Sequence, residues 1–330
     1  MPAMRLLRLA LLAALLLPSA AGAQRHASLA FVSNEASHDV SVIDVATSRV
    51  VGTIALGVRP RGIQASPDGR RVYVALSDDR PNATSRSDAI AVIDVATRRV
   101  VARYAAGSDP EQFAVTPDGA RLYASNEDAG TASATDLRTG RVLATLVVGI
   151  EPEGVAASPD GRWVYVTAET SNTVSVIDAR ANRVVTNILA DLRPRATAFS
   201  PDGARAYVTN EVSGTLVVVD TRTHEVLQSV ELERGEGKPV GVVVSPDGAR
   251  VYVANGLASV ISVLDARTLR LLARIPVARR PWGIALTRDG RRLYAACGLA
   301  DEVDVIDTAT NRVASRIRVG RRPWGIAITR

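Results

Sequence analysis

The chain of 330 residues has little of the material from which many functional sites are built. Its single cysteine, Cys297, cannot form an intramolecular disulfide and excludes zinc or iron–sulfur sites made of several cysteines. Three histidines, of which we place His224 on a surface turn, leave little for metal or haem chemistry. The net charge is +6, with no Lys/Arg run that resembles a nucleic-acid-binding tail. We therefore expect no nucleic-acid partner.

The composition is nevertheless that of a folded chain. Hydrophobic residues make up 47% and charged residues 22%, which is too apolar for a disordered protein. A prior of roughly 150 residues per domain would predict two domains. The sequence contains no nucleophile elbow, no phosphate-binding glycine loop and no metal-binding histidine pair.

The first 23 residues have the features of a secretory signal peptide. Arg5 and Arg8 supply the positive start, Leu9 to Leu17 the apolar stretch and Ala21 to Ala23 the small-residue cleavage site. The apolar stretch is shorter than the roughly 20 residues that a membrane span needs. We expect export to the periplasm and no membrane span in residues 24–330.

A turn motif recurs with nearly constant spacing. It reads Ser/Thr-Pro-Asp-Gly in five copies and Thr-Arg-Asp-Gly in a sixth, at intervals of 50, 42, 42, 45 and 42 residues. Seven residues after the start of each turn stands a tyrosine: Tyr73, Tyr123, Tyr165, Tyr207, Tyr252 and Tyr294. A run rich in Val and Ile then ends in aspartate: Asp44, Asp94, Asp136, Asp178, Asp220, Asp265 and Asp307. These aspartates end strands at turns, which indicates a structural role.

Each repeat predicts four short β-strands, because its Val- and Ile-rich runs of four to six residues are bounded by turn residues. Four strands in each of seven copies predict an all-β, seven-bladed β-propeller of four-stranded antiparallel blades. Phe31 replaces the tyrosine in the copy at the N-terminal end, and Gly325 to Ile328 form an innermost strand at the other end. We expect a single propeller over residues 24–330, with its ring closed by strands from both termini.

The repeat core resembles a known family. Tyr207-Val208-Thr209-Asn210, Val174-Ser175-Val176-Ile177-Asp178 and the Ser-Pro-Asp-Gly turn resemble the YVTN β-propeller repeat. The signal peptide, the seven copies and the Arg-Pro-x-Gly-Ile segments are similar to the PQQ-dependent catabolism-associated β-propeller proteins. That resemblance implies association with periplasmic, quinoprotein-dependent alcohol oxidation. It implies a PQQ-dependent dehydrogenase or a c-type cytochrome as a partner, with pyrroloquinoline quinone as a candidate ligand and no other cofactor expected.

The x-Pro-x-Gly connections between blades place charged and aromatic side chains at one mouth of the central channel. Side chains of this kind suit a flat anionic ligand or an acidic protein surface. The candidate binding residues are Arg59, Arg61, Arg193, Arg195, Lys238, Arg280, Trp282, Arg322 and Trp324. The same face carries both length changes of the repeat, within Ser77 to Ala89 and within Glu231 to Gly241. Length changes confined to one face of a repeat scaffold favour binding there.

Several alternatives stand beside this site. Glu35, Glu127, Glu169 and Glu211 lie on the same face and could pair with the arginines between blades. A second alternative is a calcium site of the kind that propeller lactonases use. Its ligands would be Glu35, Glu127 and Glu211, together with Asn34, Asn126 and Asn210.

The functional expectation is an exported, monomeric binding or accessory protein linked to quinoprotein oxidation. It is not expected to be an enzyme, and we predict no catalytic or metal-ligating residues. A metal-dependent lactonase or lyase and a structural cell-surface interaction module are the alternatives.

Overall fold

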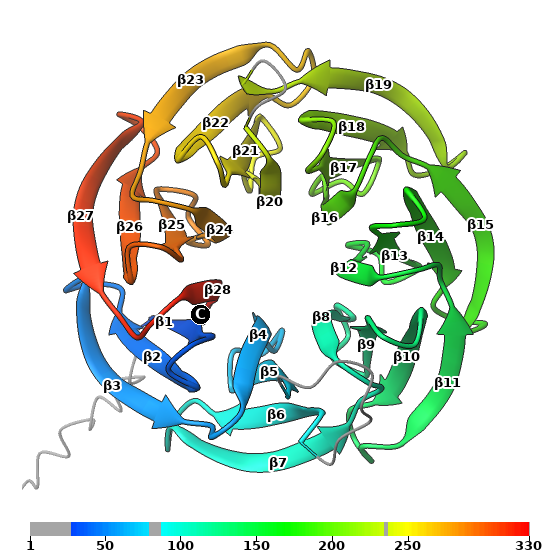
Figure 1. Cartoon of the computed structure of the whole chain (residues 1–330), viewed down its shortest axis with the longest axis horizontal. Coiled ribbons are helices and arrows are strands. Elements are labelled where there is room, and N and C mark those ends of the chain that lie inside the picture. Colours follow the sequence, from blue (N-terminus) through cyan, green and yellow to red (C-terminus); the bar gives the residue numbers. More distant parts are fainter. Residues whose placement is uncertain (1–27, 79–86, 234–236, 330) are drawn as a thin grey trace, which may run out of the picture.

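The computed structural model describes residues 28–78, 87–233 and 237–329. These residues form seven four-stranded antiparallel sheets, arranged as blades around a central opening (Figure 1). This confirms the predicted seven-bladed propeller. The expected signal peptide, residues 1–23, lies outside the described residues, and in the part that is described no helix has the length and apolarity to cross a membrane.

The strands of each blade follow one another from the channel outward. The innermost strands are β4 (Arg59–Ala65), β8 (Pro110–Val115), β12 (Pro152–Ala157), β16 (Pro194–Phe199), β20 (Pro239–Val244), β24 (Pro281–Leu286) and β28 (Pro323–Ile328). The second strands are β1 (Leu29–Asn34), β5 (Arg71–Ser77), β9 (Arg121–Asn126), β13 (Trp163–Ala168), β17 (Arg205–Asn210), β21 (Arg250–Asn255) and β25 (Arg292–Cys297).

The two outer strands complete each blade. The third strands are β2 (Asp39–Asp44), β6 (Ala89–Asp94), β10 (Thr131–Asp136), β14 (Thr173–Asp178), β18 (Thr215–Asp220), β22 (Val260–Asp265) and β26 (Glu302–Asp307). The outermost strands are β3 (Arg49–Ala55), β7 (Arg99–Ala105), β11 (Val142–Val147), β15 (Arg183–Leu189), β19 (Glu225–Glu231), β23 (Leu271–Pro276) and β27 (Arg312–Arg318).

The ring closes as the sequence predicts, with one strand from the C-terminal end and three from the N-terminal end in the same sheet. The antiparallel register of β1 and β28 pairs Phe31 with Ala327 and Ala30 with Ile328. The Ser28 hydroxyl adds a hydrogen bond of 2.7 Å to the carbonyl of Thr329. This pairing covers the edge of β1 that would otherwise be exposed.

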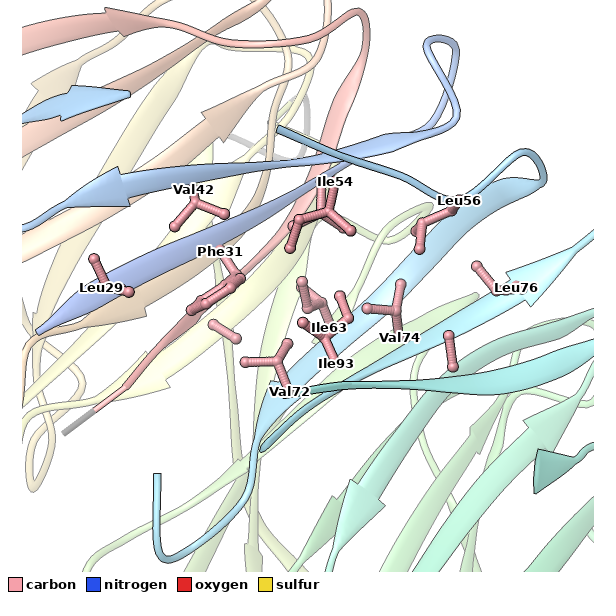
Figure 2. Close-up of a cluster of buried hydrophobic side chains, with 13 residues drawn as sticks. Leu29, Phe31, Val42, Ile54, Leu56, Ile63, Val72, Val74, Leu76 and Ile93 are labelled. Carbon is pink, nitrogen blue, oxygen red and sulfur yellow. The ribbon is translucent and has the colours of Figure 1, made fainter. Parts of the chain in front are cut away.

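The core lies between neighbouring blades. Alternate side chains of the second and third strands point to opposite faces of a sheet, so each blade offers one apolar face to each neighbour. Between the blade of β1 and the blade of β5, Phe31 and Val42 pack against Val72, Val74 and other aliphatic side chains (Figure 2). Seven such layers allow a chain of this length to fold without disulfides.

Some of the repeated tyrosines link neighbouring blades as well as filling the core. Tyr207 is buried, and its hydroxyl donates a hydrogen bond of 2.9 Å to the carbonyl of Ala266 in the next blade. Tyr123 donates in the same way to Ala179 at 3.1 Å. A buried hydroxyl needs such a partner, and each bond of this kind contributes about 1 kcal/mol.

The strand-ending aspartates have the structural role expected of them. Asp44 accepts hydrogen bonds from the backbone N–H and the hydroxyl of Thr47, at 2.8 and 2.9 Å. These bonds lower the pKa of Asp44. Asp307 and Thr310 form the same turn.

Close packing around the channel explains the glycine of the x-Pro-x-Gly connection. A Cβ atom on Gly154 would lie 2.1 Å from the carbonyl oxygen of Arg195, and one on Gly241 would lie 2.3 Å from that of Trp282. Both oxygens belong to the backbone of the next innermost strand. A side chain at either of these two glycines would push neighbouring blades apart, whereas the blades of β8 and β16 hold Gln112 and Ala196 at the same position.

His224 differs from the expectation of a surface residue on a turn. Its Nδ1 lies 2.7 Å from the Tyr165 hydroxyl, and its ring packs edge-on against Trp163 at 4.7 Å between centroids. The expectation failed because Tyr165 bonds this side chain where Tyr123 and Tyr207 bond a backbone carbonyl. Most of the two length changes, residues 79–86 and 234–236, lies outside the described residues.

Candidate functional site

The connections that enter the innermost strands share an unusual backbone at the channel mouth. The residue before the proline has a positive φ in six blades, at Asp109, Glu151, Arg193, Lys238, Arg280 and Arg322, with values from 47° to 61°. Non-glycine residues rarely adopt this conformation. It directs the carbonyl of Arg280 to accept a hydrogen bond of 2.9 Å from the N–H of Gly298. This geometry ties each connection to the residue that follows the second strand.

The third residue of each connection contributes to a ring of side chains that we call the neck belt. Its members are Arg61, Glu111, Glu153, Arg195, Val240, Trp282 and Trp324. Nη1 of Arg61 lies 2.5 Å from Oε2 of Glu111. The Arg195 guanidinium lies 4.9 Å from the ring centroid of Trp282, whose ring is 6.1 Å from that of Trp324.

Acidic residues on the same face link the basic ones between blades. Glu35 lies 3.3 Å from Nε of Arg61 and 3.8 Å from Nη1 of Arg59. Glu169 forms ion pairs with both Arg193 and Arg195. The alternative of ion pairs between blades is therefore realised for these four arginines, which already have carboxylate partners.

Two blades lack this acidic residue. The position after the second strand holds Glu35, Asp78, Glu127, Glu169 and Glu211 in five blades, whereas Gly256 and Gly298 hold it in the blades of β21 and β25. Neither glycine has a positive φ, so the backbone does not require glycine at these positions. The two substitutions remove both negative charge and bulk from one side of the mouth.

A pocket of about 550 Å³ lies at this side of the mouth. Its volume is within the range of small-molecule sites, about 300–1,000 Å³. The lining residues that matter here are Glu35, Arg61, Arg195, Arg280, Trp282, Arg322 and Trp324, with Gly256 and Gly298 at its edge. The strands that carry Trp282 and Trp324, β24 and β28, are neighbours on the left of the ring in Figure 1.

Arg280 is the cation best placed to receive an anion. Its side chain is 28% exposed, and its nearest carboxylate oxygen, on Glu211, is 3.6 Å away. Burial lowers the pKa of Arg280 and outweighs the effect of Glu211, which raises it; the neighbouring charges of Arg195, Arg193 and Arg322 lower it further. Its guanidinium also stacks 4.7 Å above the Trp282 ring. An anion in the pocket would relieve this repulsion between like charges.

The predicted binding residues fall into two groups. Arg61, Arg195, Arg280, Trp282, Arg322 and Trp324 line the pocket together. Arg59 instead pairs with Asp109 at 2.9 Å, Arg193 pairs with Glu169 and Glu211, and Lys238 is exposed outside the lining. The sequence-based search missed Gly256 and Gly298, although a comparison of the repeats at this one position would have found them.

One carboxylate cluster has the spacing of a cation site. Among the described residues, Asp109, Glu111 and Glu127 each place one oxygen within 4.8 Å of the others. Asp109 and Glu111 already pair with Arg59 and Arg61, however, so the cluster belongs to the ion-pair network. Burial raises the pKa of Glu111 well above its usual value, against the effect of Arg61, and Glu153 and Glu127 raise it further.

The asparagines of the alternative calcium site are structural. Asn34, Asn126 and Asn210 are buried at the ends of their strands. The Asn34 amide donates to the carboxylate of Asp39 at 2.6 Å, and that of Asn126 donates to the hydroxyl of Thr131 at 3.1 Å. These side chains bind their own blades rather than the channel mouth.

Two family models match parts of the chain. One, described as a lactonase with a 7-bladed beta-propeller, matches residues 185–315, which include Arg195, Gly256 and Arg280. The other, described as a choice-of-anchor I domain, matches residues 21–192. No curated protein matches this chain by sequence.

Solved structures with the same fold come from several bacteria. A protein of unknown function from Desulfotomaculum acetoxidans has a TM-score of 0.80 at 19% identity, covering 91% of this chain and 98% of its own. A candidate 6-phosphogluconolactonase from Bacteroides uniformis has a TM-score of 0.76 at 20% identity, covering 92% and 99%. Hydrazine synthase from Kuenenia stuttgartiensis has a TM-score of 0.75 at 23% identity, covering 84% and 92%. At these identities the similarity shows the fold alone.

These comparisons correct one expectation and establish a family. The expectation that the protein is not an enzyme is wrong, because the lactonase model matches the blades that form much of the pocket. The expectation came from the repetition of the charged residues from blade to blade, which favours a structural role for them. Such repetition carries no information about catalysis. The choice-of-anchor I model spans 172 of the 330 residues, and the chain therefore belongs to the choice-of-anchor I domain family.

Proposed function

We propose that this protein is a lactone hydrolase that acts on an anionic lactone bound in the pocket at the channel mouth. The observation that carries the proposal is the replacement of the acidic residue by Gly256 and Gly298, which leaves an open pocket beside Arg280 and Arg322. The lactonase model over residues 185–315 supports the reaction class. The shared fold of the candidate 6-phosphogluconolactonase is consistent with it.

The pocket provides both positive charge and aromatic surface. Arg280 and Arg322 can donate charge-assisted hydrogen bonds to a phosphate or carboxylate, each contributing about 1.5–3 kcal/mol. Trp282 and Trp324, with ring centroids 6.1 Å apart, line the pocket. Because Trp324 is only 6% exposed and the guanidinium groups of Arg280 and Arg195 lie over the Trp282 ring, the carbons of a small ring would pack against the accessible edges of the two rings. A neutral lactone would use only the second of these features.

Glu35 is the carboxylate that we assign to water activation. It lines the pocket, with one oxygen 3.3 Å from Nε of Arg61 and the other 3.7 Å from Nε of Arg322. In the proposed reaction it accepts a proton from water as the water oxygen attacks the lactone carbonyl carbon. Arg61, which lines the pocket 3.3 Å from Glu35, stabilises the negative oxygen that forms, the ring C–O bond breaks, and the ring oxygen takes the proton back from Glu35. The product is the open hydroxy acid.

The test is hydrolysis of 6-phosphogluconolactone and of unphosphorylated glucono-1,5-lactone, measured as acid release above the spontaneous rate. We expect kcat/KM to be at least about tenfold higher for the phosphorylated lactone, because its anion binds Arg280. Glu35→Gln should lower kcat by about 10²–10⁴. Glu225→Gln, an exposed acid on β19, is the matched control and should change nothing. No hydrolysis of either lactone, or full activity in Glu35→Gln, would contradict the proposal.

The quinone predicted from the family resemblance is a second candidate ligand for the same pocket. The indoles of Trp282 and Trp324 beside several arginines are residue types that bind a flat carboxylated ring system. We propose that the protein acts in the periplasm, where a quinone-dependent dehydrogenase or a c-type cytochrome could be its partner. Calorimetric titration with pyrroloquinoline quinone, with and without calcium, tests this directly. Saturable heat at micromolar quinone supports it, and silence in both buffers removes the quinone as a ligand.

A further inference from the structure

Two exposed leucines stand at the edge of the cationic pocket. Leu257 and Leu299 are 61% and 56% exposed, and both line the pocket with Arg280 and Arg322. Each follows one of the two glycines that open the pocket. In these two blades, two successive positions of the repeat therefore differ from the other blades. The first has glycine in place of an acidic residue, and the second has leucine.

The equivalent position in other blades shows that the leucines are not a requirement of the turn. It holds Asp128 and Thr170 in blades away from the pocket, Ala36 in the blade that supplies Glu35 and Trp324 to the lining, and Val212 in the blade that supplies Arg195. Small, charged and polar residues are thus all compatible with the same turn. A large aliphatic side chain is found only on the side of the mouth that carries the pocket.

The backbone fixes both leucines in place. The N–H of Leu257 donates to the carbonyl of Gly237 at 3.1 Å, and that of Leu299 donates to the carbonyl of Arg279 at 3.2 Å. Nη2 of Arg279 also donates to the Leu299 carbonyl at 3.1 Å. Their backbone is thus held at the rim of the pocket, where their side chains add apolar surface beside the guanidinium groups.

We infer that the anionic ligand of this pocket carries an aliphatic substituent, which lies over Leu257 and Leu299 while the anionic group meets Arg280 and Arg322. The inference rests on the proposed function and narrows its substrate class to anionic lactones with an alkyl or acyl chain. Covering two leucines that are more than half exposed removes apolar surface of both protein and ligand from water. A bare sugar lactone would leave this surface uncovered.

The test uses n-alkyl phosphates, from methyl to octyl, as probes that cannot be hydrolysed as lactones. Their dissociation constants are measured by calorimetry with the full-length protein. We expect affinity to rise about twofold for each added methylene, because an open rim removes only part of each methylene from water. The double variant Leu257→Ser/Leu299→Ser should abolish this rise and leave the affinity for methyl phosphate within about twofold of the wild type.

The control variant is Leu189→Ser, which changes a leucine that is 75% exposed on the outermost strand β15, away from the mouth. It should retain the full dependence on chain length. Equal affinity for methyl and octyl phosphate in the wild type would overturn the inference and leave the anion pocket intact. A chain-length dependence that survives in the double variant would also overturn it. If no alkyl phosphate binds, the assignment of this pocket as an anion-binding site is wrong, and so is the proposed function.

Discussion

Restoring the missing acidic residue should close the pocket without harming the fold. In Gly256→Glu, a carboxylate returns to the position that five other blades fill with an acidic residue. A Cβ on Gly256 would lie 3.4 Å from the Pro281 carbonyl oxygen and 3.5 Å from the Arg280 side chain, distances of ordinary or slightly tight contact. The residue has no positive φ, so its backbone accepts a side chain. We expect the free energy of unfolding to change by no more than about 0.5 kcal/mol.

The effect on anion binding should be much larger. By analogy with Glu169, which pairs with Arg193 and Arg195 of the following blade, the new carboxylate would reach Arg280. An anionic ligand would then lose a charge-assisted hydrogen bond of about 1.5–3 kcal/mol, which corresponds to about a 10- to 100-fold weaker affinity. Repulsion by the added negative charge acts in the same direction.

Calorimetry with inorganic phosphate and thermal unfolding of the same samples measure the two effects separately. Gly256→Ala adds only the Cβ and should bind phosphate as the wild type does. Gly256→Gln adds nearly the same volume without the charge, so it separates steric exclusion from electrostatics. Phosphate affinity in Gly256→Glu equal to that of the wild type would refute the assignment of Arg280 as the anion-binding cation.

Three further predictions concern the mouth and the neck of the channel. Trp282→Ala/Trp324→Ala should weaken binding of ring-shaped ligands by at least about tenfold while the protein still unfolds in one transition; unchanged affinity by calorimetry would exclude the rings as a binding surface. Because burial raises the pKa of Glu111, the folded state holds its proton more tightly than the unfolded state does. Stability should therefore fall as pH rises above the unfolded value of about 4.5, and Glu111→Gln should reduce this slope in denaturant titrations at several pH values. An unchanged slope would show that Glu111 is ionised in the fold. Gly154→Ala should cost about 1–3 kcal/mol, because its Cβ would lie 2.1 Å from the Arg195 carbonyl oxygen; a loss below 0.5 kcal/mol in urea unfolding would contradict this account of the connection.

Much of the fold could be predicted from the sequence because the repeat carries its own structural signals. The tyrosines and the Val/Ile runs define buried strands, and the aspartates define turns, as Asp44 with Thr47 illustrates. The pairing of the first N-terminal strand with the last strand followed from counting strands at the two ends of the chain, whereas the register that places Phe31 opposite Ala327 came from the structure. His224 was misplaced because its contact with Tyr165 joins residues from different blades, which periodicity does not encode.

The candidate site was predictable only in part. The repeat placed the Arg and Trp residues at one mouth of the channel, because residues at equivalent positions share a face. It did not separate Arg59 and Arg193, which are committed to ion pairs, from Arg280, which has only a carboxylate at 3.6 Å. That distinction depends on distances between side chains of different blades.

The sequence by itself determined the number of blades, the strand order and the face on which charge gathers, because each follows from local patterns of hydrophobic, turn and charged residues. The tertiary structure decided which charges are neutralised and where a ligand can enter. Gly256, Leu257 and Arg280 form one edge of a pocket only when two blades lie side by side. Such contacts arise from the curvature of the closed ring, which brings together residues that no single repeat contains.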